Sequence, residues 1–87
     1  MARASERALP VRLRPVRLGA HLTDTGADFA VLAPHATAVD LCLIDRSASG
    51  ITERRYSLHR DASFTTWVGH VSGVRAGQEY GYRVHGP

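Results

Sequence analysis

From Leu18 onward the chain consists of short apolar-rich runs separated by short polar segments that favour turns. The runs have the length and the two-residue period that are typical of half-buried β-strands. They are Phe29–Ala33, Ala38–Asp45, Ile51–Leu58, Trp67–Val71 and Glu79–Val84. No segment shows the apolar period of a long helix, and alternating and β-branched residues dominate, so the pattern predicts an all-β domain.

The same period predicts which side chains face the core. In the second run one face consists of Val39, Leu41 and Leu43, and the other of Asp40, Cys42 and Ile44. In the last run the expected inward residues are Tyr80, Tyr82 and Val84, and the expected outward residues are Gly81, Arg83 and His85.

The connecting segments predict the architecture. Arg46–Gly50, His59–Thr66 and Ser72–Gln78 are rich in residues that favour turns and are predicted to be loops. Short strands at this spacing predict a small immunoglobulin-like antiparallel β-sandwich over residues 16–87. Residues 1–15 contain Pro10 and Pro15, which discourage a helix, and are predicted to form a basic, flexible arm.

The charge distribution weakens the first impression of a nucleic-acid binder. The chain has 87 residues and a formal net charge of +3, but residues 1–17 hold five arginines against one glutamate. The rest of the chain is therefore close to neutral. A basic arm can contact phosphates, but no aromatic residues interleave with these arginines, so a solvated tail is the favoured interpretation. No nucleic-acid partner is predicted.

Cysteine content and hydropathy bear on the compartment. Cys42 is the single cysteine, which excludes a disulfide within the chain and a cysteine-based zinc site. No apolar run approaches the roughly 20 residues of a membrane helix, and the N-terminus lacks the apolar region of a secretory signal. The Arg-rich, acid-poor start partly fits a transit peptide, but with little serine. An intracellular location without membrane association is expected.

Residues with catalytic or metal-binding chemistry are present but not grouped. The histidines are His21, His35, His59, His70 and His85. Their spacing does not match metal ligands on one element. The aspartates in or beside predicted turns favour turn chemistry rather than a carboxylate pair. The sequence therefore predicts no catalytic residues, no metal site and no cofactor.

Three aromatic residues form the one candidate binding feature. If the runs that contain Trp67 and Tyr80–Tyr82 pair as a hairpin, their rings share one face. Such a face can stack on sugar rings, or it can fill the core between two sheets. The pattern favours the core for Trp67 and leaves sugar stacking as the alternative.

Two stretches carry a family resemblance. They are LGAHLTDTGADFAVLAPHATAVDLCLID and WVGHVSGVRAGQEYGYRVHGP. Together they resemble the N-terminal domain of bacterial glycogen debranching enzymes of the isoamylase type, over residues 16–87. The matching positions are Leu18-Gly19-Ala20, Phe29, the spaced Ala33, Ala36 and Val39, the DLCLID run, and every family position from Trp67 to Pro87.

The resemblance implies a fold and a context. Family members are family-13 glycoside hydrolases that begin with an immunoglobulin-like domain, classed as a family-48 carbohydrate-binding module. The implied context is cytoplasmic glycogen breakdown by hydrolysis of α-1,6 branch linkages. The family's catalytic residues lie on a (β/α)₈ barrel after the Gly-Pro, so none maps onto this chain and no catalysis is expected from it. We expect an accessory domain present without its barrel.

Site residues follow from the same resemblance. Tyr82, Arg83 and His85 are the expected residues on the side that approaches the barrel, and Trp67 is the candidate for glycogen or α-glucan binding. Two other functions remain open: a stand-alone α-glucan-binding module, and a protein-interaction sandwich whose basic arm meets acidic partners.

Overall fold

The computed structural model describes residues 17–87, which form seven β-strands and no helix. The strands are β1 (Gly19–Leu22), β2 (Gly26–Leu32), β3 (Ala38–Ser47), β4 (Gly50–Ser57), β5 (His59–Arg60), β6 (Thr66–Ser72) and β7 (Glu79–His85). The predicted arm at residues 1–15 lies outside the described part. Within residues 17–87 there is no helix that is long and apolar enough to cross a membrane.

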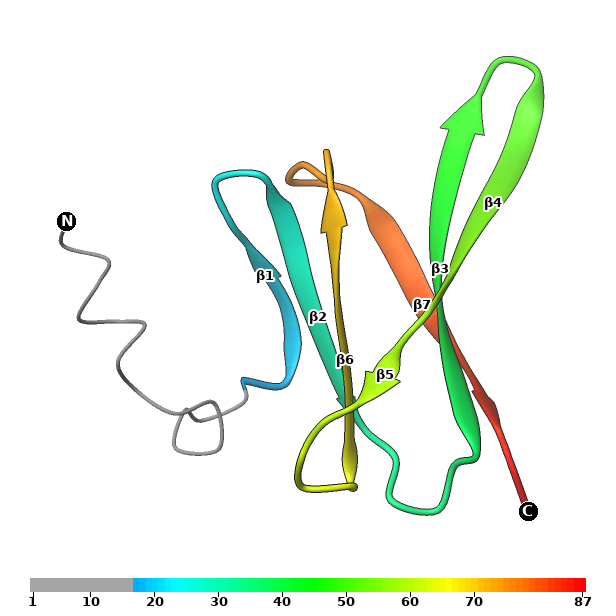
Figure 1. Ribbon diagram of the computed structural model, residues 1–87. Helices are drawn as coiled ribbons and strands as arrows, with labels where there is room; N and C mark the ends of the chain where they lie inside the picture. The colour runs from blue at the N-terminus through cyan, green and yellow to red at the C-terminus, as the bar shows by residue number, and fades with distance from the viewer. Residues whose placement is uncertain (1–16) are drawn as a thin grey trace, which may run out of the picture.

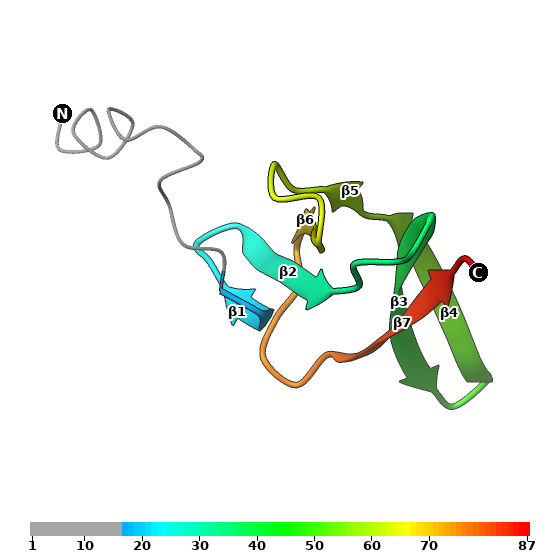
Figure 2. The ribbon, with the colours of Figure 1, turned by 90° about the horizontal axis from the view of Figure 1, so that it is seen from below.

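The strands form two antiparallel sheets (Figure 1). One sheet has the order β1-β2-β6-β5 and the other the order β4-β3-β7, and every pair of neighbours is antiparallel. Figure 2 shows the chain after β6 crossing from the first sheet to the second before it enters β7. The predicted all-β sandwich is confirmed.

The strand order matches that of an immunoglobulin-like sandwich. The first sheet corresponds to strands A, B, E and D of the immunoglobulin constant domain. In the second sheet β3 and β7 correspond to strands C and F, and β4 to strand C′, which variable domains have. β7 takes the place of strand F. It is also an edge strand, because β3 is the one described strand that pairs with it.

The core lies between the two sheets and follows the predicted alternation. Val39, Leu41 and Leu43 are at most 1% exposed, which confirms their inward face. They pack with Phe29 and Trp67 of the opposite sheet. Burying one large aliphatic side chain contributes about 1.5–3 kcal/mol, so β3 supplies much of the stabilisation of this small domain.

Two predictions about local structure were wrong, and a pairing that the sequence left as a condition does not occur. β3 and β4 extend into the predicted loop Arg46–Gly50 and leave only residues 48–49 as the turn. A two-residue strand, β5, lies within the predicted loop His59–Thr66. The hairpin between the Trp67 and Tyr80 runs does not form, because β6 pairs with β2 and β5 while β7 pairs with β3. The period of a strand specifies its faces but not its partner.

Gly26 opens β2 where the backbone of β6 passes very close. A Cβ added at Gly26 would lie 2.0 Å from the Val71 carbonyl oxygen and 2.8 Å from the Ser72 Cα. Backbone atoms cannot move aside as a flexible side chain can. By contrast, a Cβ at Gly81 of β7 would meet nothing within 4 Å.

We expect Gly26→Ala to lower the free energy of unfolding by about 2–3 kcal/mol, because the new methyl group forces β2 and β6 apart. Gly81→Ala is the matched control in another strand and should change the stability by less than about 0.5 kcal/mol. Urea unfolding of the two variants checks this. Equal midpoints would contradict the close approach of β2 and β6.

Candidate functional site

Trp67, the predicted glucan-binding residue, lies in the core. It is 6% exposed, and its indole nitrogen Nε1 donates a hydrogen bond to the Ala33 carbonyl oxygen at 3.1 Å. The Arg60 guanidinium lies 5.0 Å from the ring centroid, in cation–π geometry. Because its ring is buried and Arg60 lies over it, the Trp67 face is not offered to a sugar in this conformation, which favours the core alternative.

The two tyrosines of β7 lie at the open side of the sandwich. Tyr80 stands edge-to-face with Phe29 at 5.3 Å and with Tyr82 at 5.8 Å between ring centroids. Tyr80 is 41% exposed and Val84 is 58% exposed, so the face that was predicted inward is only partly covered. The Tyr82 hydroxyl is buried and has no hydrogen-bond partner among the described residues, and burial raises the pKa of this phenol.

The other face of β7 carries two of the predicted barrel-facing residues. Arg83 and His85 project from the outer face of their sheet, while Tyr82 points to the inner face. The structure thus brings Arg83 and His85 together and separates Tyr82 from them. This follows from the two-residue period of a strand. A role of any of the three towards a barrel remains a prediction.

A charged network covers the outer face of that sheet. Arg83 donates to both carboxylate oxygens of Glu53 at 3.4 Å, and Arg55 Nη2 donates to Glu53 Oε2 at 3.2 Å. His85 Nε2 lies 3.1 Å from Asp40 Oδ2. The interactions of Glu53 with Arg83, Cys42 and Arg55, that with Arg83 first, lower the pKa of its carboxyl to about 2.

Cys42 lies beneath this network. Its side chain is on the outer face of β3, yet the residue is only 5% exposed. Burial and the neighbouring Glu53 carboxylate raise the pKa of the thiol. A thiol in such surroundings stays protonated and is a poor nucleophile.

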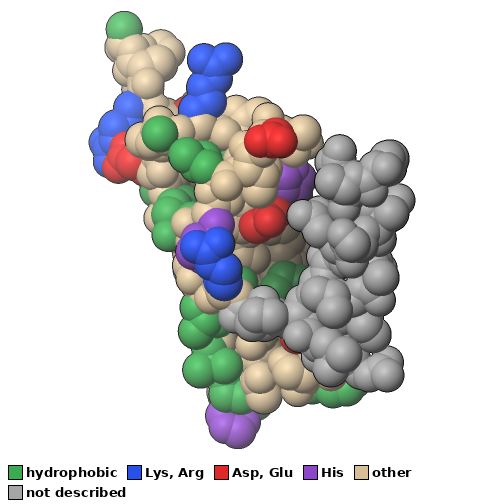
Figure 3. Space-filling view, turned by 90° about the vertical axis from the view of Figure 1, so that its left-hand side faces the viewer, with side chains coloured by type: hydrophobic (Ala, Val, Ile, Leu, Met, Phe, Trp, Pro, Cys, Tyr) green, Lys and Arg blue, Asp and Glu red, His purple; other side chains and the backbone are tan. Residues whose placement is uncertain are grey.

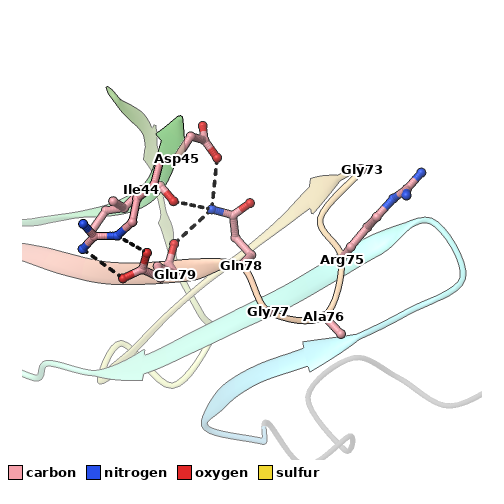
Figure 4. Close-up of a pocket in the computed structure, with 9 residues that line it drawn as sticks. Ile44, Asp45, Gly73, Arg75, Ala76, Gly77, Gln78 and Glu79 are labelled. Atoms are coloured by element: carbon pink, nitrogen blue, oxygen red, sulfur yellow. Dashed lines mark hydrogen bonds and ion pairs between the residues drawn. The ribbon is translucent and has the colours of Figure 1, made fainter. Parts of the chain in front are cut away.

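A shallow hollow lies between the end of β3 and the loop from Gly73 to Gln78 (Figure 4). Its volume is about 420 Å³. The charged groups along β3 and β7 are already paired. Gln78 Nε2 donates to the Ile44 carbonyl at 2.9 Å and to the Asp45 carboxylate at 3.2 Å. Arg46 forms an ion pair with Glu79. Arg75 extends away from the hollow, which leaves few free donors inside it for a ligand.

A second hollow is more apolar. It has a volume of about 230 Å³ and is lined by Leu22, Phe29, Val74 and Tyr80 among others, and by Arg75. Figure 3 shows hydrophobic side chains gathered along one side of the molecular face, near basic and histidine side chains. Partly exposed apolar groups of this kind suit contact with another protein surface.

Phe64 is a candidate that sequence reasoning missed. Its side chain is 66% exposed on the loop between β5 and β6, and its φ of 64° lies in the left-handed region that bulky residues rarely adopt. The loop is held by hydrogen bonds from Phe64 N to Asp61 O at 2.9 Å and from Asp61 N to Thr66 O at 2.7 Å. The only sequence signal was an isolated phenylalanine in a polar loop.

The histidines do not gather into a metal site. Among residues 17–87 no group of three or more His, Cys, Asp or Glu side chains could hold a metal ion. His70 instead bridges two elements of the first sheet: Nδ1 lies 2.7 Å from Asp28 Oδ1, and Nε2 lies 3.1 Å from Thr25 Oγ1. This arrangement fastens the β1–β2 turn to β6.

Comparison with known proteins identifies the domain. Residues 17–87 match the family described as "Carbohydrate-binding module 48 (Isoamylase N-terminal domain)". The chain belongs to carbohydrate-binding module family 48. This confirms the family resemblance that the sequence carries.

Two solved structures share the architecture. The chain is similar to pullulanase type I from Bacillus subtilis str. 168, solved with maltose, at 26% identity and a TM-score of 0.66. The match covers 84% of this chain and 10% of that one. The catalytic module of the pneumococcal glycogen-degrading virulence factor SpuA matches with the same TM-score at 19% identity. This match covers 87% of this chain and 12% of that one, and it supports the fold alone. This chain thus corresponds to a small part of each protein.

The lowered pKa of Glu53 predicts an acid-sensitive contribution to stability. The carboxylate stabilises the fold above its ordinary pKa of 4.5, and this stabilisation is lost as the pH falls towards about 2. We expect Glu53→Gln to be less stable at neutral pH and to show a shallower loss of stability between pH 4.5 and 2. Urea unfolding across this range, with carboxyl titration by NMR, checks it. A Glu53 carboxyl that titrates near 4.5 would contradict the network.

Proposed function

We propose that this family-48 domain is the N-terminal accessory module of a cytoplasmic glycogen debranching enzyme, a family-13 glycoside hydrolase that hydrolyses α-1,6 branch linkages. The family match over residues 17–87 carries the proposal. The match to a small part of a pullulanase chain and of a glycogen-degrading chain supports it, because most of each of those two chains lies outside the matched domain. In this proposal the catalytic groups lie on a barrel outside the 87 residues.

We place the barrel contact on the outer face of the β4-β3-β7 sheet, at Arg83 and His85. Both side chains are about half exposed, and partners within the sheet hold both in place. Preorganised charged side chains lose little conformational entropy when they dock on a complementary surface. Tyr82 supports this face from the inside, by packing against the core beneath β7.

The test is association with a family-13 catalytic domain produced without its own module. We expect Arg83→Ala and His85→Ala to weaken the association by roughly tenfold each, as loss of a hydrogen bond to the docked partner would. His70→Ala is the matched control, because His70 also pairs with an aspartate but on the opposite sheet. Calorimetry measures the affinity. Equal weakening by His70→Ala, or no association of the unchanged domain, would contradict the placement.

A second candidate function, direct α-glucan binding, is favoured by Phe64. Its exposed ring on a hydrogen-bonded loop can stack on a glucose residue, which the buried Trp67 cannot do in this conformation. This function is compatible with an accessory role. It also applies to a stand-alone module.

If the domain binds glucan, Phe64→Ala should weaken binding to glycogen roughly three- to tenfold, because one stacking contact is lost. Ile51→Ala is the control, since Ile51 is equally exposed, at 63%, but offers no aromatic face. Affinity electrophoresis in gels with and without glycogen measures the retention. Retention that is unchanged by Phe64→Ala would reject this residue as the binding site.

A further inference from the structure

Among residues 17–87, β7 has a strand neighbour on one side only, which is β3. In the immunoglobulin constant domain, strand G pairs with strand F on the side away from strand C. β7 holds the place of strand F, and residues 17–87 put no strand on that side of it. A seven-residue edge strand of this kind offers unpaired backbone donors and acceptors to a partner.

The backbone direction of β7 follows from the neighbouring pairs. Leu58 N donates to Val39 O at 2.9 Å, so the odd-numbered residues of β3 direct their backbone groups to β4. The even-numbered residues of β3 therefore face β7 and pair with its odd-numbered residues. It follows that Tyr80, Tyr82 and Val84 direct their N–H and C=O groups to the free edge.

The side chains of β7 are arranged symmetrically about its middle. On the inner face Tyr80 and Val84 flank Tyr82, and both flanking side chains are substantially exposed. On the outer face Glu79 and His85 occupy the two ends. A strand with this pattern is therefore complementary to a second, antiparallel copy of itself.

We propose that a second copy of this chain pairs with it, β7 against β7 and antiparallel, about a two-fold axis at Tyr82. In this register Tyr80 lies opposite Val84 of the second copy, an aromatic–β-branched pair of the kind that stabilises sheets. Glu79 lies opposite His85 of the second copy, so the ends of the two strands carry complementary groups. The two three-stranded sheets become one sheet of six strands.

This register also allows backbone hydrogen bonds between the two strands and leaves room for the side chains. The pairs about the axis join even-numbered residues, whose backbone groups point to the free edge. Arg83 of the second copy comes opposite Gly81, where even a Cβ would meet nothing within 4 Å. The interface is isologous, as in most homodimers.

The other edges of the sandwich fit a second copy less well. β1 has four residues and β5 has two. β4 has eight residues, but a two-fold axis at its middle places Glu53 against Glu53 or Arg54 against Arg54 of the second copy. Like charges directly opposite each other are destabilising.

This inference does not depend on the proposed function. Edge-to-edge pairing leaves Arg83 on the outer face accessible on both copies, and Val84, which the dimer test changes, is not part of the proposed barrel contact, so the two can be tested separately. Loss of one would say nothing against the other.

The test uses the 87-residue chain in sedimentation velocity over concentrations up to about 1 mM, a range that detects weak dimers. We expect a species of twice the 9.5 kDa chain mass to grow with concentration. Val84→Pro removes an N–H that points to the free edge and keeps the bonds to β3, as proline on an edge strand allows. It should weaken dimerisation roughly tenfold to a hundredfold, because symmetry doubles the lost hydrogen bond.

Val84→Thr keeps the N–H and the β-branched shape and is the matched control, which should still dimerise. Circular dichroism and thermal unfolding show whether the proline variant is folded. If that variant does not fold, isotope-filtered NOEs between Tyr80 and Val84 of different copies of the unchanged chain still report the register. A chain that stays monomeric at about 1 mM would overturn the proposal. So would a dimer that a folded Val84→Pro leaves unchanged, or a β7 edge that binds only an added catalytic domain.

Discussion

The inner face of β3 is the feature on which the rest of this domain depends. Val39, Leu41 and Leu43 are almost completely buried between the two sheets, and each removes a large aliphatic side chain from water. β3 is also the central strand of its sheet, paired with β4 on one side and with β7 on the other. The buried residues of the opposite sheet, Phe29 and Trp67 among them, pack against this face, so both sheets are organised around this strand.

The inward position of these residues also determines which residues of β3 lie on the outer face of the sheet. Asp40 and Cys42 must then point outward, next to Glu53 and Arg83 of the neighbouring strands. The charged side chains bond to one another and cover the thiol, which lowers the pKa of Glu53 and raises that of Cys42. The outer face is thus charged around Cys42, whereas Ile51 on the same face is an exposed apolar residue.

The aromatic residues fall into a buried group and an exposed group. Trp67 and Phe29 are buried in the core, whereas Tyr80 and Phe64 remain partly or largely exposed. The exposed rings lie on different elements, one on an edge strand and one on a loop. The three contacts that we propose, with a glucan, a catalytic domain and a second copy, therefore use different parts of the described surface of this family-48 domain.

The sequence by itself determined the class of fold, the faces of the strands and the family. Alternation in Ala38–Asp45 was sufficient to predict the buried face, because the two-residue period is a local property of an extended chain. The motif from Trp67 to Pro87 was sufficient for the family resemblance. Only the tertiary structure decided that β6 and β7 belong to different sheets, since strand pairing depends on contacts between distant segments. It also placed Trp67 under Arg60 and Phe64 in solvent, because the exposure of a ring depends on which other segments fold over it.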